Sequence, residues 1–203
     1  MTISKGGPYG EPGALPADGV VVASDAEAAA VVTEARRGGH PVPTLGLVGG
    51  DLCRTLGGLG DADRLRGSEA TTFPVDLGCV LLDGRLHWFV AHLVARRPRW
   101  SGRFAVAMNA EWLDDLDLGP RAHPGDGLLD LTEGRLGLRD RLAARRRART
   151  GSHLPHPGLR TSRAGKAELT FPDGVPVFLD GLAVGTAREL LLHVEPDALT
   201  VVV

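Results

Sequence analysis

A change of pattern near residue 70 divides the chain into two parts with different secondary structure. Before it, two short apolar runs, Val20–Ala23 and 43–48, have the length and composition of buried strands. Each run is followed by a helical segment: 26–37 is rich in alanine and stops at Gly38-Gly39, and a shorter segment covers 52–56. This alternation of strands and helices is typical of an open α/β sheet.

After residue 70 the pattern becomes that of short strands joined by tight turns. Val75–Leu82 leads into Asp83-Gly84, a strong β-hairpin signal, and Leu86–Ala95 is expected to be the returning strand. More strands are expected from residue 167 onward, and one helix at about 137–149. The predicted fold class is α/β plus mainly β. It combines a reduced N-terminal α/β lobe with a C-terminal antiparallel, β-sandwich-like lobe that carries one basic helix.

Four segments are expected along the chain. Residues 1–18 are rich in glycine and proline, which predicts a flexible leader. Residues 19–70 are expected to form the α/β lobe and residues 71–195 the β-rich lobe. Residues 196–203 are predicted to be a terminal strand that returns to the first lobe.

Composition excludes several classes of protein. The net charge is −2 and the pI about 6.4, so the chain has no overall attraction for polyanions. Aromatic residues are only 4% and do not interleave with the arginines, which argues against nucleic acid as a partner. The chain shows neither a secretory signal nor an apolar run near the ~20 residues of a membrane helix. We expect a soluble, cytoplasmic protein, with the inner membrane face as a surface for peripheral contact.

The densest group of polar residues is a loop at 119–130. Two prolines and three glycines fix an irregular path there, which can aim Asp126, Asp130 and the carbonyl of Leu128 at one point, as a hard cation requires. The same residues also suit a simple Asp-Gly turn in which Asp126 accepts backbone amides. From the residues alone, both interpretations stay open.

The helix at about 137–149 is strongly basic. Leu138 and Leu142 lie one turn apart, which predicts an apolar side. A run of arginines is commonly a solvated face, but it can also contact anionic phospholipid headgroups, at about 1 kcal/mol per basic residue. The residues assigned to a lipid surface are Arg141, Arg145, Arg146 and Arg147.

The polar loop belongs to an ordered set of motifs that resembles the diacylglycerol-kinase-like (YegS-like) lipid kinases of bacteria. The loop is similar to that family's P-x-A-x-P-x-D-G-L-L-D, and a helix and Gly151-Ser152-His153 follow it. Residues 49–57 are similar to the family's G-T-G-N-D-L-A-R-T-L-G, and 178–182 to the segment that carries V-D-G-E. Residues 196–203 look like the family's terminal strand. Together the matches span residues 20–203 in the family's order.

The resemblance implies a two-lobed kinase that binds ATP in its α/β lobe and a lipid in its β-rich lobe. In such kinases backbone amides approach the phosphates at glycine-rich turns, Mg²⁺ bridges phosphate oxygens, and a carboxylate accepts the proton of the lipid hydroxyl. The positions that the resemblance assigns to the nucleotide are Asp25, Gly49, Gly50, Asp51 and Arg54. Those that it assigns to a structural Mg²⁺ are Asp126, Leu128 and Asp130.

Departures from the family pattern argue against ATP as a cofactor. The family's G-G-D-G-T is Ala23-Ser24-Asp25-Ala26-Glu27 here, so side chains replace glycines that let phosphate approach the backbone. Leu47 and Val48 stand before Gly49, and Leu182, which cannot take a proton, replaces the V-D-G-E carboxylate. The family's opening βαβ unit is also expected to be missing before Val20. We therefore expect a truncated, degenerate lipid-kinase fold, a pseudokinase that binds a lipid or an anionic ligand.

Two alternatives remain. One is an active, ATP- and Mg²⁺-dependent lipid kinase with a rebuilt site, which would use Asp25, Asp51 and Asp126. His123, whose neutral imidazole can act as a base near pH 7, and Asp180 are its catalytic candidates. The other is a non-catalytic subunit that borrows a nucleotide-binding lobe from a partner protein.

Overall fold

The computed structural model describes residues 9–203 of the chain. Its first part has the expected strand–helix–strand–helix order, and the elements are β2 Val20–Val22, α1 Asp25–Gly38, β3 Leu45–Leu47 and α2 Gly50–Thr55. Local chemistry fixes the bounds of α1. The Ser24 hydroxyl accepts the amide of Glu27, and the Glu27 carboxylate accepts the amide of Ala23 at 2.8 Å, a variant of the capping box in which the carboxylate reaches one residue before the N-cap. Gly39 ends the helix in the left-handed region at φ 68°.

The second part consists mainly of antiparallel strands. Asp83-Gly84 joins β4 to β5, as its turn signal predicted, but the expected returning strand is broken at 90–91 into β5 and β6. The strands are β4 Thr71–Leu82, β5 Arg85–Phe89, β6 His92–Ala95, β7 Arg103–Met108, β8 Trp112–Leu113, β9 Leu116–Asp117, β10 Leu129–Arg135, β11 Leu159–Ala164, β12 Lys166–Leu179 and β13 Leu182–Val202. The helix expected between them is α3 Leu138–Ala148, and two short 3₁₀ turns lie at Arg64–Arg66 and Pro98–Trp100.

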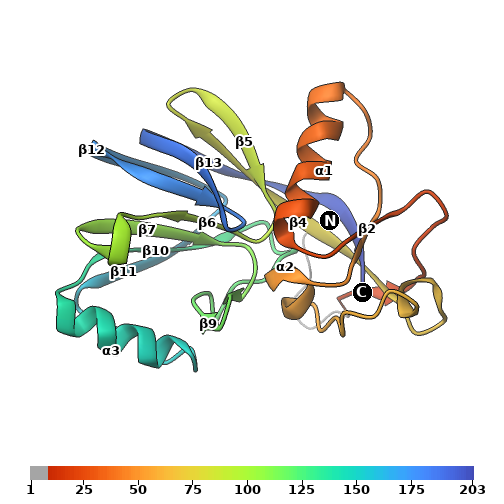
Figure 1. Cartoon of the computed structure of the whole chain (residues 1–203), viewed down its shortest axis with the longest axis horizontal. Helices are drawn as coiled ribbons and strands as arrows, with labels where there is room; N and C mark the ends of the chain where they lie inside the picture. Colours follow the sequence, from red (N-terminus) through yellow and green to blue (C-terminus); the bar gives the residue numbers. More distant parts are fainter. Residues whose placement is uncertain (1–8) are drawn as a thin grey trace.

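One continuous sheet carries both parts of the molecule. Its main path runs β1-β4-β13-β12-β6-β7-β10-β11, with β5 paired to β4 and the parallel strands β2 and β3 added through β13. The sheet folds into two layers, so that β12 and β13 lie over β6, β7 and β10 (Figure 1). Side chains from seven strands meet in one apolar core between the layers, which includes Phe89, Leu93 and Leu190. The expected class, α/β plus a mainly-β lobe, is confirmed.

The helices cover different faces of this sheet. α1 and α2 pack with β2 and β3 on the first part, where Val32, Leu45 and Leu52 form a second core with Val75 of β4. α3 lies below β7, β10 and β11 at the far end of the molecule (Figure 1). Within residues 9–203, no helix combines the length and the apolar character needed to cross a membrane.

The segment expected to be a flexible leader is partly built into the fold. Residues 1–8 lie outside the described residues. Beyond them, β1 (Glu11–Pro12) pairs with Thr71 and Thr72 of β4, and the Leu15 side chain is only 4% exposed. An apolar side chain and an edge of the sheet therefore hold part of the segment 9–18 against the fold.

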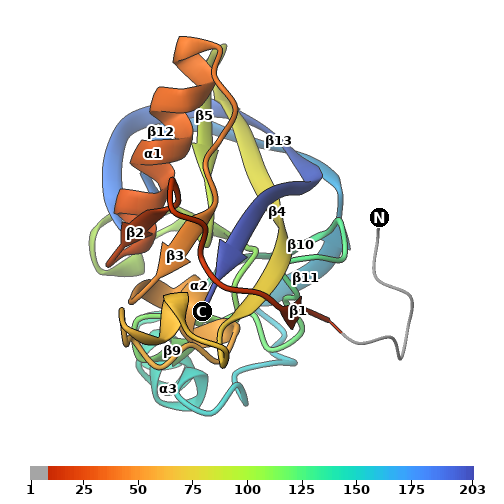
Figure 2. The same ribbon diagram turned by 90° about the vertical axis from the view of Figure 1, so that its right-hand side faces the viewer.

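The end of the chain returns to the first part as the final segment of β13. Val201 and Val202 pair in parallel with β3 and antiparallel with β4, next to the first part of the chain (Figure 2). The break expected at residue 196 is a bulge between Glu195 and Leu199 inside one strand of 21 residues. A single strand thus belongs to both parts.

Candidate functional site

The glycine-rich turn before α2 is filled by a side chain of the protein itself. Asp25, the first residue of α1, accepts the amide of Asp51 at 2.6 Å and the amide of Leu52 at 3.1 Å. Gly50 has φ +92°, and a Cβ added there would lie 2.5 Å from the Asp25 carboxylate. Amides at a helix N-terminus are natural anion-binding groups, and here they already hold a carboxylate. The structure brings together Asp25, Gly49, Gly50 and Asp51, four of the residues assigned to the nucleotide, and their binding of a nucleotide stays a prediction.

Asp51 links this turn to the β-rich part through His92. The Asp51 carboxylate lies 3.1 Å from His92 Nε2 and accepts the amide of Asp114 at 3.1 Å. Burial lowers the pKa of His92, but its hydrogen bond to Asp51 and the nearby Asp180 carboxylate outweigh burial, so the pKa is raised. Asp25, Asp51 and His92 offer three potential metal ligands within 4.8 Å of one another. His92 was not among the predicted site residues, although it is the only polar side chain in the apolar run 89–95.

Asp180 occupies a nest of backbone amides. Its carboxylate accepts the amides of Val90, Ala91 and His92 at 2.8–3.0 Å. Burial nevertheless raises the pKa of Asp180 to about 6, against the effect of His92 and of these hydrogen bonds. Leu182, which begins β13 two residues after Asp180, is 58% exposed. A catalytic role for Asp180 stays a prediction, and its visible role is to hold the chain where β5 gives way to β6.

Arg54, the last residue assigned to the nucleotide, is engaged by the small hairpin β8–β9. Its guanidinium lies 3.4 Å from the centre of the Trp112 ring and donates to the carbonyl of Asp114 at 3.0 Å. These contacts join α2 to the β-rich part. Binding of phosphate by Arg54 would have to compete with them.

A large pocket lies between the sheet and α3. Its volume is about 640 Å³. Side chains alternate along each strand, so β7 sends Ala105 and Ala107 into the main core and Phe104 and Val106 into the pocket. The same alternation places His92 and Val94 of β6, and Arg96 just after it, on the pocket side. The apolar wall is completed by Trp100, Leu113, Leu116, Leu118, Leu136, Ala144, Leu159 and Phe178.

The pocket is bordered by basic and apolar residues of α3. Arg141 and Arg145 line it, and Arg141 donates to the carbonyl of Arg99 at 2.6 Å. Arg145, Arg146 and Arg147 are exposed. Leu138 and Leu142, expected on a packed apolar side, are 66% and 60% exposed, and both lie at the pocket. The helix therefore presents leucines and arginines together to the surroundings.

The carboxylates assigned to Mg²⁺ are paired with an arginine from the neighbouring strand β11. Arg163 pairs with Asp126 and also lies 2.8 Å from Asp130 Oδ1. The remaining oxygen of Asp126 accepts the amide of Leu128 at 3.0 Å, as the Asp-Gly turn interpretation expected. Both carboxylates contact one guanidinium, so the residues as arranged do not fit a Mg²⁺ ion between them. Binding of Mg²⁺ elsewhere in the protein stays a prediction.

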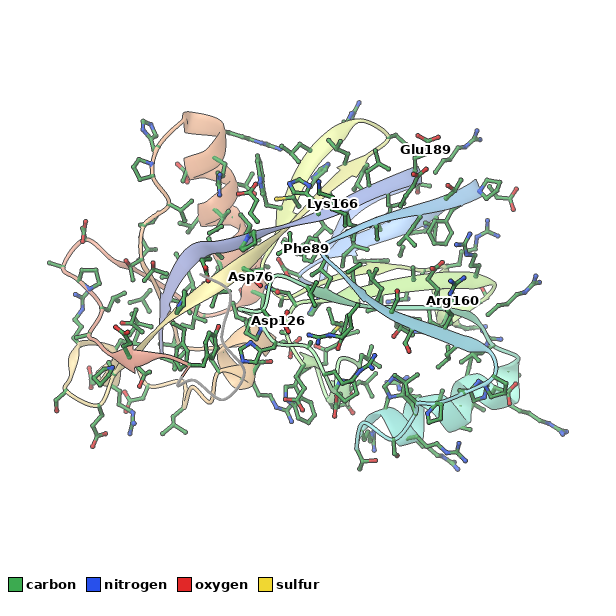
Figure 3. All side chains as sticks on the ribbon, turned by 180° about the vertical axis from the view of Figure 1, so that it is seen from behind. Asp76, Phe89, Asp126, Arg160, Lys166 and Glu189 are labelled. Atoms are coloured by element: carbon green, nitrogen blue, oxygen red, sulfur yellow. The ribbon has the colours of Figure 1, made fainter. Side chains whose placement is uncertain are left out.

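His123 packs inside the same loop. Its Nδ1 accepts the amide of Gly125 at 3.3 Å. The centroids of the His123 and Tyr9 rings are 4.5 Å apart in an edge-to-face arrangement. Asp76 of β4 was overlooked, although it is the lone charged residue in an apolar strand. It is fully buried and accepts the amides of Gly127 at 2.6 Å and Asp197 at 2.9 Å (Figure 3).

Comparison with known proteins adds information on the fold. No protein-family model and no curated protein match the sequence. The structure is similar to three solved structures from Bacillus anthracis str. Sterne that are named as diacylglycerol kinases, two of them provisionally. Their identities with this chain are 15%, 15% and 16%, and the TM-scores are 0.65, 0.66 and 0.63. The alignments cover 91% of this chain and 77%, 77% and 75% of theirs. At this identity the comparison establishes the fold alone.

Proposed function

We propose that this chain, which has a lipid-kinase fold, binds a lipid chain in the pocket beneath α3 and does not carry out ordinary ATP-dependent phosphorylation. The pocket is the observation that supports binding. Its volume of about 640 Å³ is within the ~300–1,000 Å³ range of small-molecule sites. The wall is mostly apolar, so a hydrocarbon chain would bury its surface there with few polar groups left without partners.

The filled glycine turn supports the second half of the proposal. A triphosphate would need the amides that Asp25 holds, and its negative charge would meet the carboxylates of Asp25 and Asp51. Leu182 supplies no proton acceptor at the position of the family's carboxylate. Both features act in the same direction, against binding of the nucleotide and against deprotonation of an alcohol.

One observation favours the rival, an active kinase. Asp25, Asp51 and His92 converge closely enough to share a divalent cation, which could bring a phosphate into the same place. The rival predicts that Mg-ATP stabilises the protein and that Asp51→Ala removes this effect. Our proposal predicts stabilisation by a lipid chain instead.

The pocket is tested with 1-dodecanol as the probe. At about 100 times its Kd, it should raise the Tm of the wild-type protein by about 5–10 °C. Val106→Trp places an indole in the pocket and should abolish this shift, whereas Val21→Trp, at a valine that is 43% exposed on β2, should retain it. The readout is differential scanning fluorimetry with calorimetric titration. A shift that survives Val106→Trp would reject the pocket, and transfer of phosphate from ATP to any lipid by the purified protein would establish the rival.

We further propose that α3 docks on an anionic membrane, which would place the pocket next to its ligand. Changing Arg145, Arg146 and Arg147 together to alanine should weaken binding to phosphatidylglycerol-containing vesicles roughly 100-fold, at about 1 kcal/mol per arginine. A matched triple change of exposed arginines on strands, Arg85, Arg160 and Arg188, should have little effect. Vesicle flotation measures both. Equal losses in the two variants would show that only net charge matters and that α3 is not the docking surface.

A further inference from the structure

The loop between β9 and β10 is fixed to β4 by Asp76. The Asp76 carboxylate accepts the amide of Gly127 at 2.6 Å, and the Asp76 amide donates to the carbonyl of Pro124 at 2.6 Å. Asp76 and Asp126 accordingly lie close together in the middle of the molecule (Figure 3). These bonds hold the backbone of the loop. They leave the side chains of Asp126 and Asp130 to be neutralised by another group.

Arg163 supplies the neutralising charge from the neighbouring strand. It lies in β11 directly opposite Asp130 of β10 in the antiparallel register. Its Nε is 2.8 Å from Asp130 Oδ1, and its Nη2 donates to Asp126 Oδ2. One guanidinium therefore bridges a carboxylate of the loop and a carboxylate of the strand that follows it.

We propose that Arg163 is a built-in cation that stands where a divalent ion would otherwise sit between Asp126 and Asp130, so that the loop is ordered without metal. Carboxylates that converge from a turn and an adjacent strand are the oxygen donors that Mg²⁺ and Ca²⁺ use. A guanidinium fits two such carboxylates because its N–H groups form a planar, rigid fork. The guanidinium and a metal ion compete for the same oxygens.

The contact between Arg163 and Asp130 is partly shielded from solvent, which strengthens it. The side chain of Asp130 is 9% exposed and that of Arg163 30%. Burial raises the pKa of Asp130, and the charge of Arg163 acts against that rise. Removal of Arg163 would leave two nearby carboxylates, one of them well buried, without their ion-pair partner, although the charge of Arg121 would still act on Asp130. Such a pair should then acquire affinity for a hard divalent cation.

Thermal unfolding of the full chain tests the proposal. In EDTA, Arg163→Ala should lower the Tm by about 3–6 °C, as expected for the loss of 1–2 kcal/mol in a domain of this size. Excess MgCl₂ should restore at least half of that loss in Arg163→Ala and leave the wild-type Tm unchanged. Adding Asp126→Asn to Arg163→Ala should remove the restoration. Arg160→Ala is the matched control, because Arg160 is exposed on the same strand and lies away from Asp126 (Figure 3).

A second measurement detects the bound metal directly, in the wild-type protein and in Arg163→Ala, and needs no comparison of their stabilities. Paramagnetic Mn²⁺ should leave the amide signals of residues 126–130 unbroadened in the wild type and broaden them in Arg163→Ala. Broadening of these signals in the wild type, or Mg²⁺ stabilisation of the wild type equal to that of Arg163→Ala, would mean that metal displaces the guanidinium and would overturn the proposal. Failure of Mg²⁺ to restore Arg163→Ala would also overturn it.

Discussion

The free energy of unfolding is expected to fall as the pH rises from about 4 to about 6, with Asp180 contributing about 2–3 kcal/mol to the fall. Burial raises the pKa of this carboxyl from 3.8 to about 6. Between these values the folded chain holds a proton that the unfolded chain has released, so protonation favours the fold. This stabilisation is complete below the unfolded pKa and is lost as the pH passes the folded one. Urea unfolding across this range should show a flatter pH dependence for Asp180→Asn than for the wild type.

Asp83 is a matched control whose pKa is shifted in the opposite direction. Both aspartates open an Asp-Gly turn, have φ near +46° and accept backbone amides, but Asp83 is exposed. Its hydrogen bonds with Glu189 and Arg188 lower its pKa, so its contribution is present at neutral pH and is lost on acidification. Asp83→Asn should therefore leave the fall between about pH 4 and 6 nearly unchanged and reduce the loss of stability on acidification below about pH 4. An unchanged slope in Asp180→Asn would show that burial does not govern that carboxyl.

The second large effect is expected in the core, where Phe89→Ala should lower the free energy of unfolding by about 3–5 kcal/mol. Phe89 is fully buried and stands opposite Gly78 in the β4–β5 pair. A Cβ at Gly78 would overlap atoms of the Phe89 ring, so Gly78→Ala alone should cost about 1–3 kcal/mol through overpacking.

In Phe89→Ala, however, the space of the ring is free, and the methyl group of Gly78→Ala can enter it. The double variant should then be clearly more stable than the sum of the two single losses predicts. Urea unfolding of the four proteins gives this coupling energy directly. Additive losses would mean that the glycine and the ring do not share one space.

Patterns within short segments of the sequence predicted much of the fold. Three features depend on residues that are neighbours in the sequence: the Asp83-Gly84 hairpin, the capped helix α1 and the change to antiparallel strands. Such features can be predicted without knowledge of distant contacts. The pairing of Glu11 with Thr72 and the burial of Leu15 were not predicted, because they depend on strands far along the chain. Local glycine and proline content carries no information about such partners.

The candidate site was predictable only in part, for the same reason. The turn with Asp25 and Asp51 follows from motif spacing. His92, Asp76 and Arg163 act through contacts with residues 41, 51 and 37 positions away, respectively, which no local pattern encodes. A single polar residue inside an apolar strand was the available signal for His92 and Asp76. Arg163, on an exposed strand rich in polar residues, gave none.

The length of β13 has a mechanical consequence. It pairs with β4 in a long antiparallel ladder that begins at the β-rich core and ends beside β3. A rotation of one part of the molecule relative to the other would have to break backbone hydrogen bonds between β13 and β4. The pairing of β13 with both β4 and β3 therefore opposes a hinge motion between the two parts of the molecule.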